Sequence, residues 1–192
     1  MAITKEGIVK ASLDILNRGG IGSLSMRTLA KELNIKAASL YWHIKNKQDL
    51  IDLIAEHITQ EISLPETIDD TEEALTDLAF EFRRVLLKTR DAVEVFAQSI
   101  PRTPYRIKTI KFVLAALTKY GVSNKNCITA GNLVNNYILS FVADEIRTKD
   151  ICPEEAEQLG LLWGEQYEMN LDFDRQFLYG LEVLFAGLKA VE

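Results

Sequence analysis

Apolar residues recur every three or four positions along most of the chain, which is the spacing of one face of an α-helix. No segment shows the strict alternation of apolar and polar residues, bounded by hairpin turns, that indicates a β-strand. The pattern therefore predicts an all-α protein. Its helices are expected at about residues 4–18, 25–34, 37–43, 46–62, 71–89, 92–99, 104–120, 123–149, 153–168 and 172–191.

Capping and helix-breaking residues indicate where the short N-terminal helices begin and end. Gly19 and Gly20 interrupt the first helix, and Ser25 is a good N-cap for the second. Asn46, with Asp49 three residues later, resembles a capping box at the start of a longer helix. Pro65 and the acidic residues after it mark a turn. We therefore expect an N-terminal domain at residues 1–46, a linking helix at 47–64 and a C-terminal domain at 65–192.

Charge is divided unevenly along the chain. The 192 residues carry a net charge of −6, which by itself argues against a protein that binds nucleic acid. Residues 1–48, however, hold 8 Lys and Arg against 3 Asp and Glu, a net charge of +5. Residues 49–192 hold 14 against 25, a net charge of −11. A basic N-terminal part on an acidic body is typical of a phosphate-binding module joined to a module with another task.

The two short helices expected at residues 25–34 and 37–43 have the arrangement of a helix-turn-helix, whose second helix enters the major groove of DNA. Small residues that begin this second helix would let its backbone approach base edges, and the polar or basic side chains that follow would contact phosphates. The alternative is that Tyr41 and Trp42 pack a small core while Lys45 and Lys47 are solvated. The pattern alone leaves both interpretations open.

Two longer strings favour the first interpretation. "GIGSLSMRTLAKELNIKAASLYWH" and the overlapping "LYWHIKNKQDLIDLI" resemble the N-terminal domain of the tetracycline-repressor (TetR) family of bacterial regulators, most of all its tetracycline-repressor branch. The resemblance continues in "LLKTRDAVEVFA" and in "FDRQFLYGLEVLFAGLKA" and covers nearly the whole chain, with the middle weakest. It implies a ligand-responsive regulator, most often a repressor, with a helix-turn-helix head and a larger C-terminal domain for ligand binding and dimerisation.

The resemblance also implies which residues contact double-stranded operator DNA. Arg27 is expected to contact a base, and Trp42 to pack or make an apolar contact. Ala37 and Ala38 stand where the tetracycline repressors have larger residues, so we expect a different operator that is read partly through apolar contacts such as a thymine methyl group. The implied DNA-binding positions are Arg27, Ala37, Ala38, Ser39, Tyr41, Trp42, His43 and Lys47, with mostly phosphate contacts for Ser39, Tyr41, His43 and Lys47.

The helices at about 123–149 and 172–191 are the candidates for a homodimer. A helix-turn-helix usually binds two half-sites as a two-fold dimer. The last helix is apolar over a wide arc, and its glycines, Gly180 and Gly187, would permit close helix approach. Burial of this arc within its own subunit is the alternative to a four-helix dimer interface. The apolar residues concerned are Phe173, Phe177, Leu181, Leu184, Phe185 and Leu188.

A small-molecule effector is expected in the C-terminal domain. Asn132, Asn136, Ser140 and Asp144 form a polar stripe that suits an interface, a ligand cavity or simply the solvated side of its helix. The resemblance places a magnesium-binding histidine of the tetracycline repressors at Phe96, which has no lone pair for a metal, so tetracycline with magnesium is not the expected inducer. We expect a largely apolar or aromatic molecule instead. The predicted ligand-binding residues are Phe82, Phe96, Ser99, Asn136 and Asp144.

Other functional classes find little support. His43 and His57 belong to no nucleophile–base arrangement, metal-ligand spacing or phosphate-binding glycine loop. We therefore expect no enzyme, no metal and no cofactor; a dimeric ligand-binding module or an activator is the alternative function. Cys127 and Cys152 are isolated, and neither a signal peptide nor a bilayer-spanning apolar run is apparent, so we expect a cytoplasmic protein.

Overall fold

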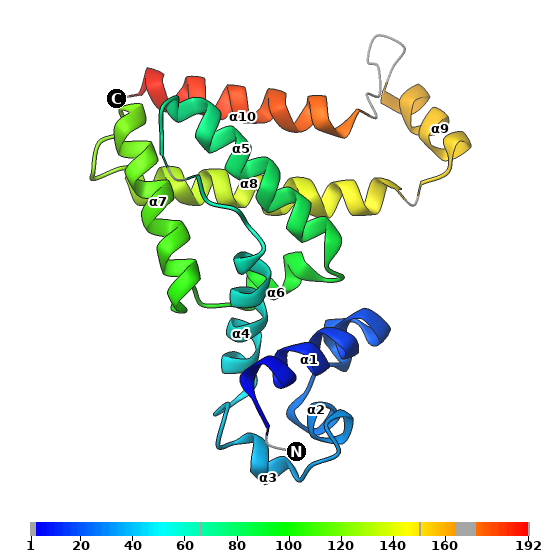
Figure 1. The fold of residues 1–192 in the computed structure, drawn as a ribbon. Helices are drawn as coiled ribbons and strands as arrows, with labels where there is room; N and C mark the ends of the chain where they lie inside the picture. Colours follow the sequence, from blue (N-terminus) through cyan, green and yellow to red (C-terminus); the bar gives the residue numbers. More distant parts are fainter. Residues whose placement is uncertain (1–2, 66, 150, 164–171, 192) are drawn as a thin grey trace. The chain divides into compact units, whose positions relative to one another are not determined.

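The computed structural model describes residues 3–65, 67–149, 151–163 and 172–191. These residues form helices and no β-strand, as the apolar pattern predicts (Figure 1). Nearly all expected helices are present within a few residues of their predicted ends. The elements are α1 (Lys5–Gly19), the 3₁₀ helix η1 (Ile21–Ser23), α2 (Met26–Glu32), α3 (Ala37–Leu40), α4 (Lys47–Gln60), α5 (Thr71–Lys88), α6 (Ala92–Gln98), α7 (Pro104–Tyr120), α8 (Cys127–Lys149), α9 (Pro153–Trp163) and α10 (Phe173–Ala190).

Three of the expected helices differ from the structure in length or coverage. The helix expected at 123–149 begins later, because α8 starts at Cys127. The helix expected at 37–43 ends earlier, because α3 ends at Leu40 and residues 41–43 form a turn. The Leu40 carbonyl accepts hydrogen bonds from both His43 N and Ile44 N, so the chain tightens there before Asn46 caps the next helix. For the helix expected at 153–168, α9 is described to Trp163, and residues 164–168 lie outside the described part.

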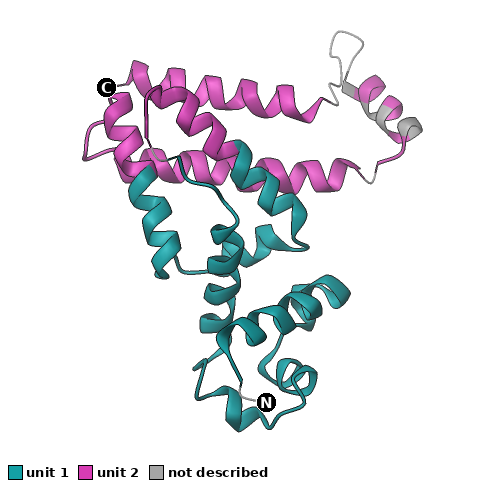
Figure 2. Ribbon diagram, in the orientation of Figure 1, with its two compact units in different colours: residues 1–66, 80–112 teal, residues 67–79, 113–192 magenta. Residues whose placement is uncertain are grey.

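The chain divides into two compact units (Figure 2). Unit 1 comprises residues 1–66 and 80–112, and unit 2 comprises residues 67–79 and 113–192. The long helices α5 and α7 each contribute residues to both units. The boundaries that we predict at residues 46 and 64 are functional divisions, and they stay a prediction.

Unit 1 is built around α4, which packs against α1 and α6. One apolar face of α1 and one of α4 are buried, as the helical spacing predicts; Ile8, Leu16, Leu50 and Ile54 are each fully inaccessible to solvent. Ser25 and Thr28 form a capping box at the start of α2. This packing and the cap set the orientation of α2 and α3 relative to α1.

Unit 2 is held together by α8 and α10. Phe177, Leu181 and Phe185, spaced by four on α10, are buried within the subunit, so this part of the apolar arc is internal. Gly180 permits a close approach of Tyr137 on α8, because a Cβ at that position would lie 2.2 Å from the tyrosine hydroxyl. That hydroxyl donates a hydrogen bond to the Phe177 carbonyl at 2.9 Å.

Candidate functional site

A small set of buried aliphatic residues forms the core against which the helix-turn-helix packs. Leu29 on α2, Leu40 on α3 and Ile44 in the turn after α3 are almost inaccessible to solvent. Asn34, in the turn between the two helices, has a φ of 53°, the left-handed conformation that ends α2 and redirects the chain. Burial of these residues leaves the other side of α3 outward-facing.

The eight predicted DNA-binding residues all lie at the start of α2, on α3, in the following turn or at the start of α4. Six are exposed and two, Ser39 and His43, are half-buried. Tyr41 is 54% exposed and Trp42 is 90% exposed, so neither packs the core that the alternative interpretation requires. We refer to the eight residues as the head surface.

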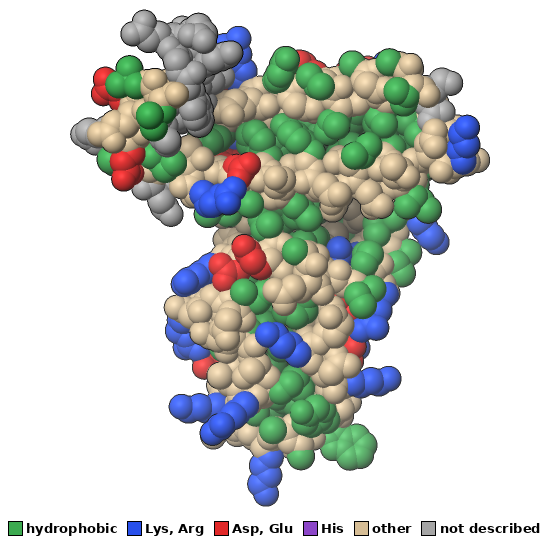
Figure 3. Space-filling model, turned by 180° about the vertical axis from the view of Figure 1, so that it is seen from behind, with side chains coloured by type: hydrophobic (Ala, Val, Ile, Leu, Met, Phe, Trp, Pro, Cys, Tyr) green, Lys and Arg blue, Asp and Glu red, His purple; other side chains and the backbone are tan. Residues whose placement is uncertain are grey.

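The head surface has its polar groups available. Within the described chain, none of its side chains makes a hydrogen bond or an ion pair to another residue. Several Lys and Arg side chains project around this end of unit 1 (Figure 3). Exposed cations, small residues and large aromatic side chains on one short helix and its flanks suit contact with a phosphate backbone and a groove.

The structure brings together the three predicted ligand-binding residues of unit 1. The rings of Phe82 on α5 and Phe96 on α6 meet edge-on, with centroids 4.9 Å apart. Ser99 follows α6, and its hydroxyl donates to the Phe96 carbonyl at 3.0 Å. Arg106 on α7, a residue that we did not predict, places its guanidinium carbon 4.8 Å from the Phe96 ring centroid and donates to the Ser99 hydroxyl.

A second group missed from the sequence lies on α4. The carboxylates of Asp49, Asp52 and Glu56, which we call the α4 carboxylate cluster, bind the segment between α6 and α7. Asp52 accepts from Ile100 N at 2.8 Å and from Arg102 Nε at 2.7 Å, and Asp49 accepts from the same arginine.

Glu56 completes this attachment, because its side chain, on α4, caps the N-terminus of α7. Its two oxygens accept from Tyr105 N at 2.9 Å and Arg106 N at 3.1 Å, in the first turn of α7. These N–H groups have no partner within their own helix, and a carboxylate there also interacts favourably with the helix dipole. The segment beside the predicted ligand-binding residues is therefore bonded directly to the helix that leads to the head.

The end of α1 is bonded to the junction of α5 and α6. Arg90 donates to the Asn17 carbonyl at 3.0 Å, and Asp91 accepts from Ile21 N at 2.6 Å. Gly20, between Asn17 and Ile21 in the sequence, has a φ of 70° and a ψ of 177°, a conformation that only glycine adopts readily. Arg90 and Asp91 belong to "LLKTRDAVEVFA", but nothing in that string alone indicates that they bind the end of α1.

The predicted ligand-binding residues Asn136 and Asp144 lie in unit 2, on α8. All four members of the polar stripe, Asn132 and Ser140 included, are exposed. Asp144 forms an ion pair with Arg147 one turn away. Within the subunit the stripe is thus the solvated side of α8, and a ligand role for Asn136 and Asp144 stays a prediction.

The predicted dimer helices present apolar surface beside their buried faces. Hydrophobic side chains gather over the long helices of unit 2 (Figure 3). On α8, Ile128 is 67% and Leu133 48% exposed; on α10, Tyr179 is 68% and Val183 53% exposed. Exposed apolar residues on two helices that pack together are typical of a surface that a partner covers.

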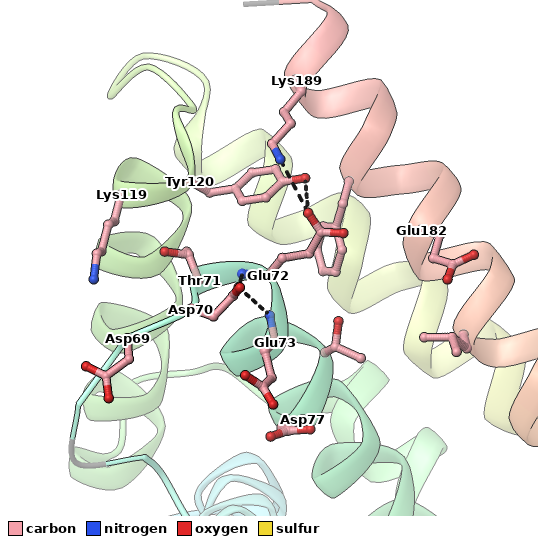
Figure 4. A pocket seen from close by; sticks show the side chains of 13 residues that line it. Asp69, Asp70, Thr71, Glu72, Glu73, Asp77, Lys119, Tyr120, Glu182 and Lys189 are labelled. Carbon is pink, nitrogen blue, oxygen red and sulfur yellow. Dashed lines mark hydrogen bonds and ion pairs between the residues drawn. The ribbon is translucent and has the colours of Figure 1, made fainter.

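Unit 2 also contains a cleft of about 590 Å³ at the N-terminus of α5 (Figure 4). Asp70 Oδ1 accepts from Glu72 N and Glu73 N, and the Glu72 side chain bonds the Tyr120 hydroxyl and Lys189. The other carboxylates of the cleft are exposed. Acidic residues in the first turn of a helix interact favourably with the helix dipole, which is a structural explanation for the acidic residues of this cleft.

Among the described residues, no three His, Cys, Asp or Glu side chains are grouped so as to hold a metal ion. In the same ranges, no helix has the length and apolar character needed to cross a membrane. Cys127 is buried and Cys152 exposed, and both are free thiols.

Known protein families match both the N-terminal and the C-terminal part of the chain. Residues 8–54 match the family model of bacterial regulatory proteins of the tetR family, and residues 64–192 match the tetracyclin repressor-like C-terminal domain. The class D tetracycline repressor protein of Escherichia coli is 30% identical, over 97% of this chain and 89% of that protein.

Solved structures agree with the family models. The Streptomyces coelicolor TetR family protein ActR, in complex with actinorhodin, is similar with a TM-score of 0.87 and 27% identity, over 99% of this chain and 98% of that chain. BioQ with its double-stranded DNA operator has a TM-score of 0.75 and 29% identity, over 97% and 98%. The resemblance drawn from the sequence is confirmed: the chain belongs to the TetR family of bacterial regulatory proteins.

Proposed function

We propose that this protein is a ligand-responsive transcriptional repressor that binds operator DNA as a homodimer and leaves it when a small aromatic molecule binds. The head surface carries the proposal, because it exposes Tyr41 and Trp42 beside cationic side chains on a firmly packed helix-turn-helix. Similar proteins have been solved with a double-stranded operator and with actinorhodin, which supports both halves of the function.

Operator binding is tested by fluorescence anisotropy with DNA from the region upstream of the protein's own gene, at several salt concentrations. We expect sequence-selective binding whose affinity falls steeply with salt. Arg27→Ala should reduce affinity by about tenfold to a hundredfold and relax sequence preference, since a base contact is worth about 1–3 kcal/mol. Lys47→Ala should weaken binding to all sequences. It should also reduce the slope of log affinity against log salt concentration by about one.

A matched control separates these effects from loss of charge. Lys125→Ala removes an exposed cation of unit 2, which carries no residue of the head surface, and should leave operator affinity unchanged. Binding by the wild type that is no tighter than to random DNA would contradict the proposal. So would an equal loss in Lys125→Ala and Lys47→Ala.

The dimer is proposed to form through the exposed apolar residues of α8 and α10. Val183→Glu places a charge at an exposed apolar position of α10 and should give a monomer by light scattering. Ile110→Glu, which alters a residue 40% exposed on α7, is the control and should stay dimeric. A dimeric Val183→Glu protein would show that other surfaces associate.

The proposed switch passes through the segment between α6 and α7. A ligand that binds against Phe96 and Ser99 contacts the residues directly before Ile100, which is bonded to Asp52 on α4. Displacement of this segment is therefore transmitted to the helix that leads to the head. Ligand releases DNA by preferring a state with altered head spacing, and the size of the effect equals its difference in affinity for the two states.

A further inference from the structure

Arg106 places a charge among the aromatic residues of the proposed ligand site. Its guanidinium stacks on Phe96, whose ring meets that of Phe82, and it donates to the Ser99 hydroxyl. Phe82, Ser99 and Arg106 are half-buried, whereas Phe96 is only 8% exposed. Aromatic rings, a hydroxyl and a cation thus converge at one place in unit 1, where three of the four residues keep part of their surface exposed.

Most of the hydrogen-bonding capacity of this guanidinium is unused. An arginine side chain has five N–H donors. In the described part of the chain, the Arg106 side chain makes one hydrogen bond, to Ser99, and no ion pair. Asp52 and Glu56 attract its charge at longer range, but their oxygens accept from Ile100, Arg102 and the backbone of α7.

Removal from water acts on this arginine more strongly than its neighbours do. Burial lowers the pKa of Arg106, and the attraction of Asp52 and Glu56 offsets this only in part. A partly desolvated cation with open donors gains more from an anionic oxygen than from a neutral one, since charge-assisted hydrogen bonds are about twice as strong. The guanidinium also lies over the Phe96 ring, and its planar fork of donors suits bidentate binding of a carboxylate.

We propose that Arg106 binds the acidic group of the effector, which is an aromatic carboxylic acid whose ring packs against Phe82 and Phe96. This inference rests on the proposed ligand site and narrows its ligand from aromatic molecules in general to aromatic acids. Ser99 is then a positioning residue, because its hydroxyl holds the guanidinium over the ring.

The test compares 2-naphthoate with 2-naphthamide, which differ in charge but hardly in shape. Binding to the full, DNA-free chain is measured by equilibrium dialysis near neutral pH for the wild type, Arg106→Gln, Arg106→Lys and Lys111→Gln. Lys111 is an exposed cation on the same helix, so Lys111→Gln controls for general loss of charge. Circular dichroism melting shows which variants are folded.

We expect the wild type and Lys111→Gln to bind naphthoate about tenfold or more tightly than the amide. Arg106→Gln should lose this preference, and Arg106→Lys should keep part of it because the charge remains without the planar fork. If Arg106→Gln does not fold, the proposal is tested by whether Arg106→Lys shows a reduced preference for naphthoate over the amide.

Three results would overturn the proposal. These are equal affinity of the wild type for acid and amide, a preference that persists undiminished in the Arg106 variants, and no binding of naphthoate at millimolar concentration. Operator binding by the same wild-type preparation is measured separately. Its failure would contradict the repressor function while the acid–amide comparison still decides the role of Arg106.

Discussion

Replacing Asp52 with alanine measures how firmly α4 holds the segment that follows α6. The Asp52 carboxylate is 2% exposed and accepts hydrogen bonds from Gln48, Ile100 N and Arg102. Hydrogen bonds to a charged group contribute about 1.5–3 kcal/mol each when partly buried. The bond to Arg102 counts for less, about 1 kcal/mol or below, because the arginine side chain is 51% exposed and screened by solvent.

The backbone amide of Ile100 therefore dominates the expected loss. We estimate that Asp52→Ala lowers the free energy of unfolding by about 2–3 kcal/mol, since the amide loses its acceptor and a cavity remains. For a chain of this size, that corresponds to a fall in Tm of roughly 4–12 °C. Asp52→Asn keeps one acceptor oxygen and should lose about half as much.

The assay is thermal unfolding followed by circular dichroism at one fixed protomer concentration, because association would otherwise shift Tm. Asp14→Ala, at an exposed aspartate of α1, is the control and should change Tm by less than about 2 °C. An Asp52→Ala protein that melts together with this control would refute the claim that the buried carboxylate holds the segment.

Three other substitutions test separate parts of the structure. Gly20→Ala should lower stability by about 1–3 kcal/mol, because it forces a glycine-only conformation and sets a Cβ 2.7 Å from a carboxylate oxygen of the α5–α6 junction; Gly22→Ala, with open space around it, is the control in urea unfolding. Glu81→Gln tests acid sensitivity: a hydrogen bond from Arg84 lowers the pKa of Glu81 below its ordinary 4.5, so its stabilisation is present above that pH and lost as the pH falls through the lower value. The Tm difference between wild type and Glu81→Gln should shrink from pH 7 to about pH 3, and a constant difference would contradict this. Phe185→Ala removes a fully buried ring and should cost about 3–5 kcal/mol in the same urea assay; a loss below about 1 kcal/mol would show that α10 is not packed as described.

Features set by neighbours along the chain were predictable from the sequence. The buried face of α1 follows from helical spacing, and the N-cap of α2 follows from Ser25. The exposed stretch that carries the head surface also follows from local turn and cap signals, while its contacts with DNA stay a prediction. Asn46 caps α4 as expected, but Asp49 bonds Lys45 N and Arg102 rather than completing a capping box.

Features that join distant segments were missed. Asp52 and Arg102 are fifty positions apart, and a carboxylate on an amphipathic helix looks like any solvated residue until its partner is known. Gly180 was expected to permit close helix approach, but only the fold shows that Tyr137 of the same subunit fills the space beside it. Arg106 gave no signal either, because the ring on which it stacks belongs to another helix.

The bonds from Arg90 and Asp91 to the end of α1 have a practical consequence for building chimeric regulators. A graft of residues 1–47 onto a relative's body would transfer the predicted DNA-binding residues and leave behind the two side chains that hold Asn17 and Ile21. The part of the chain that such a graft has to move is therefore discontinuous in sequence. A designer who wants a new operator preference on an old effector response should move positions 90 and 91 together with the head.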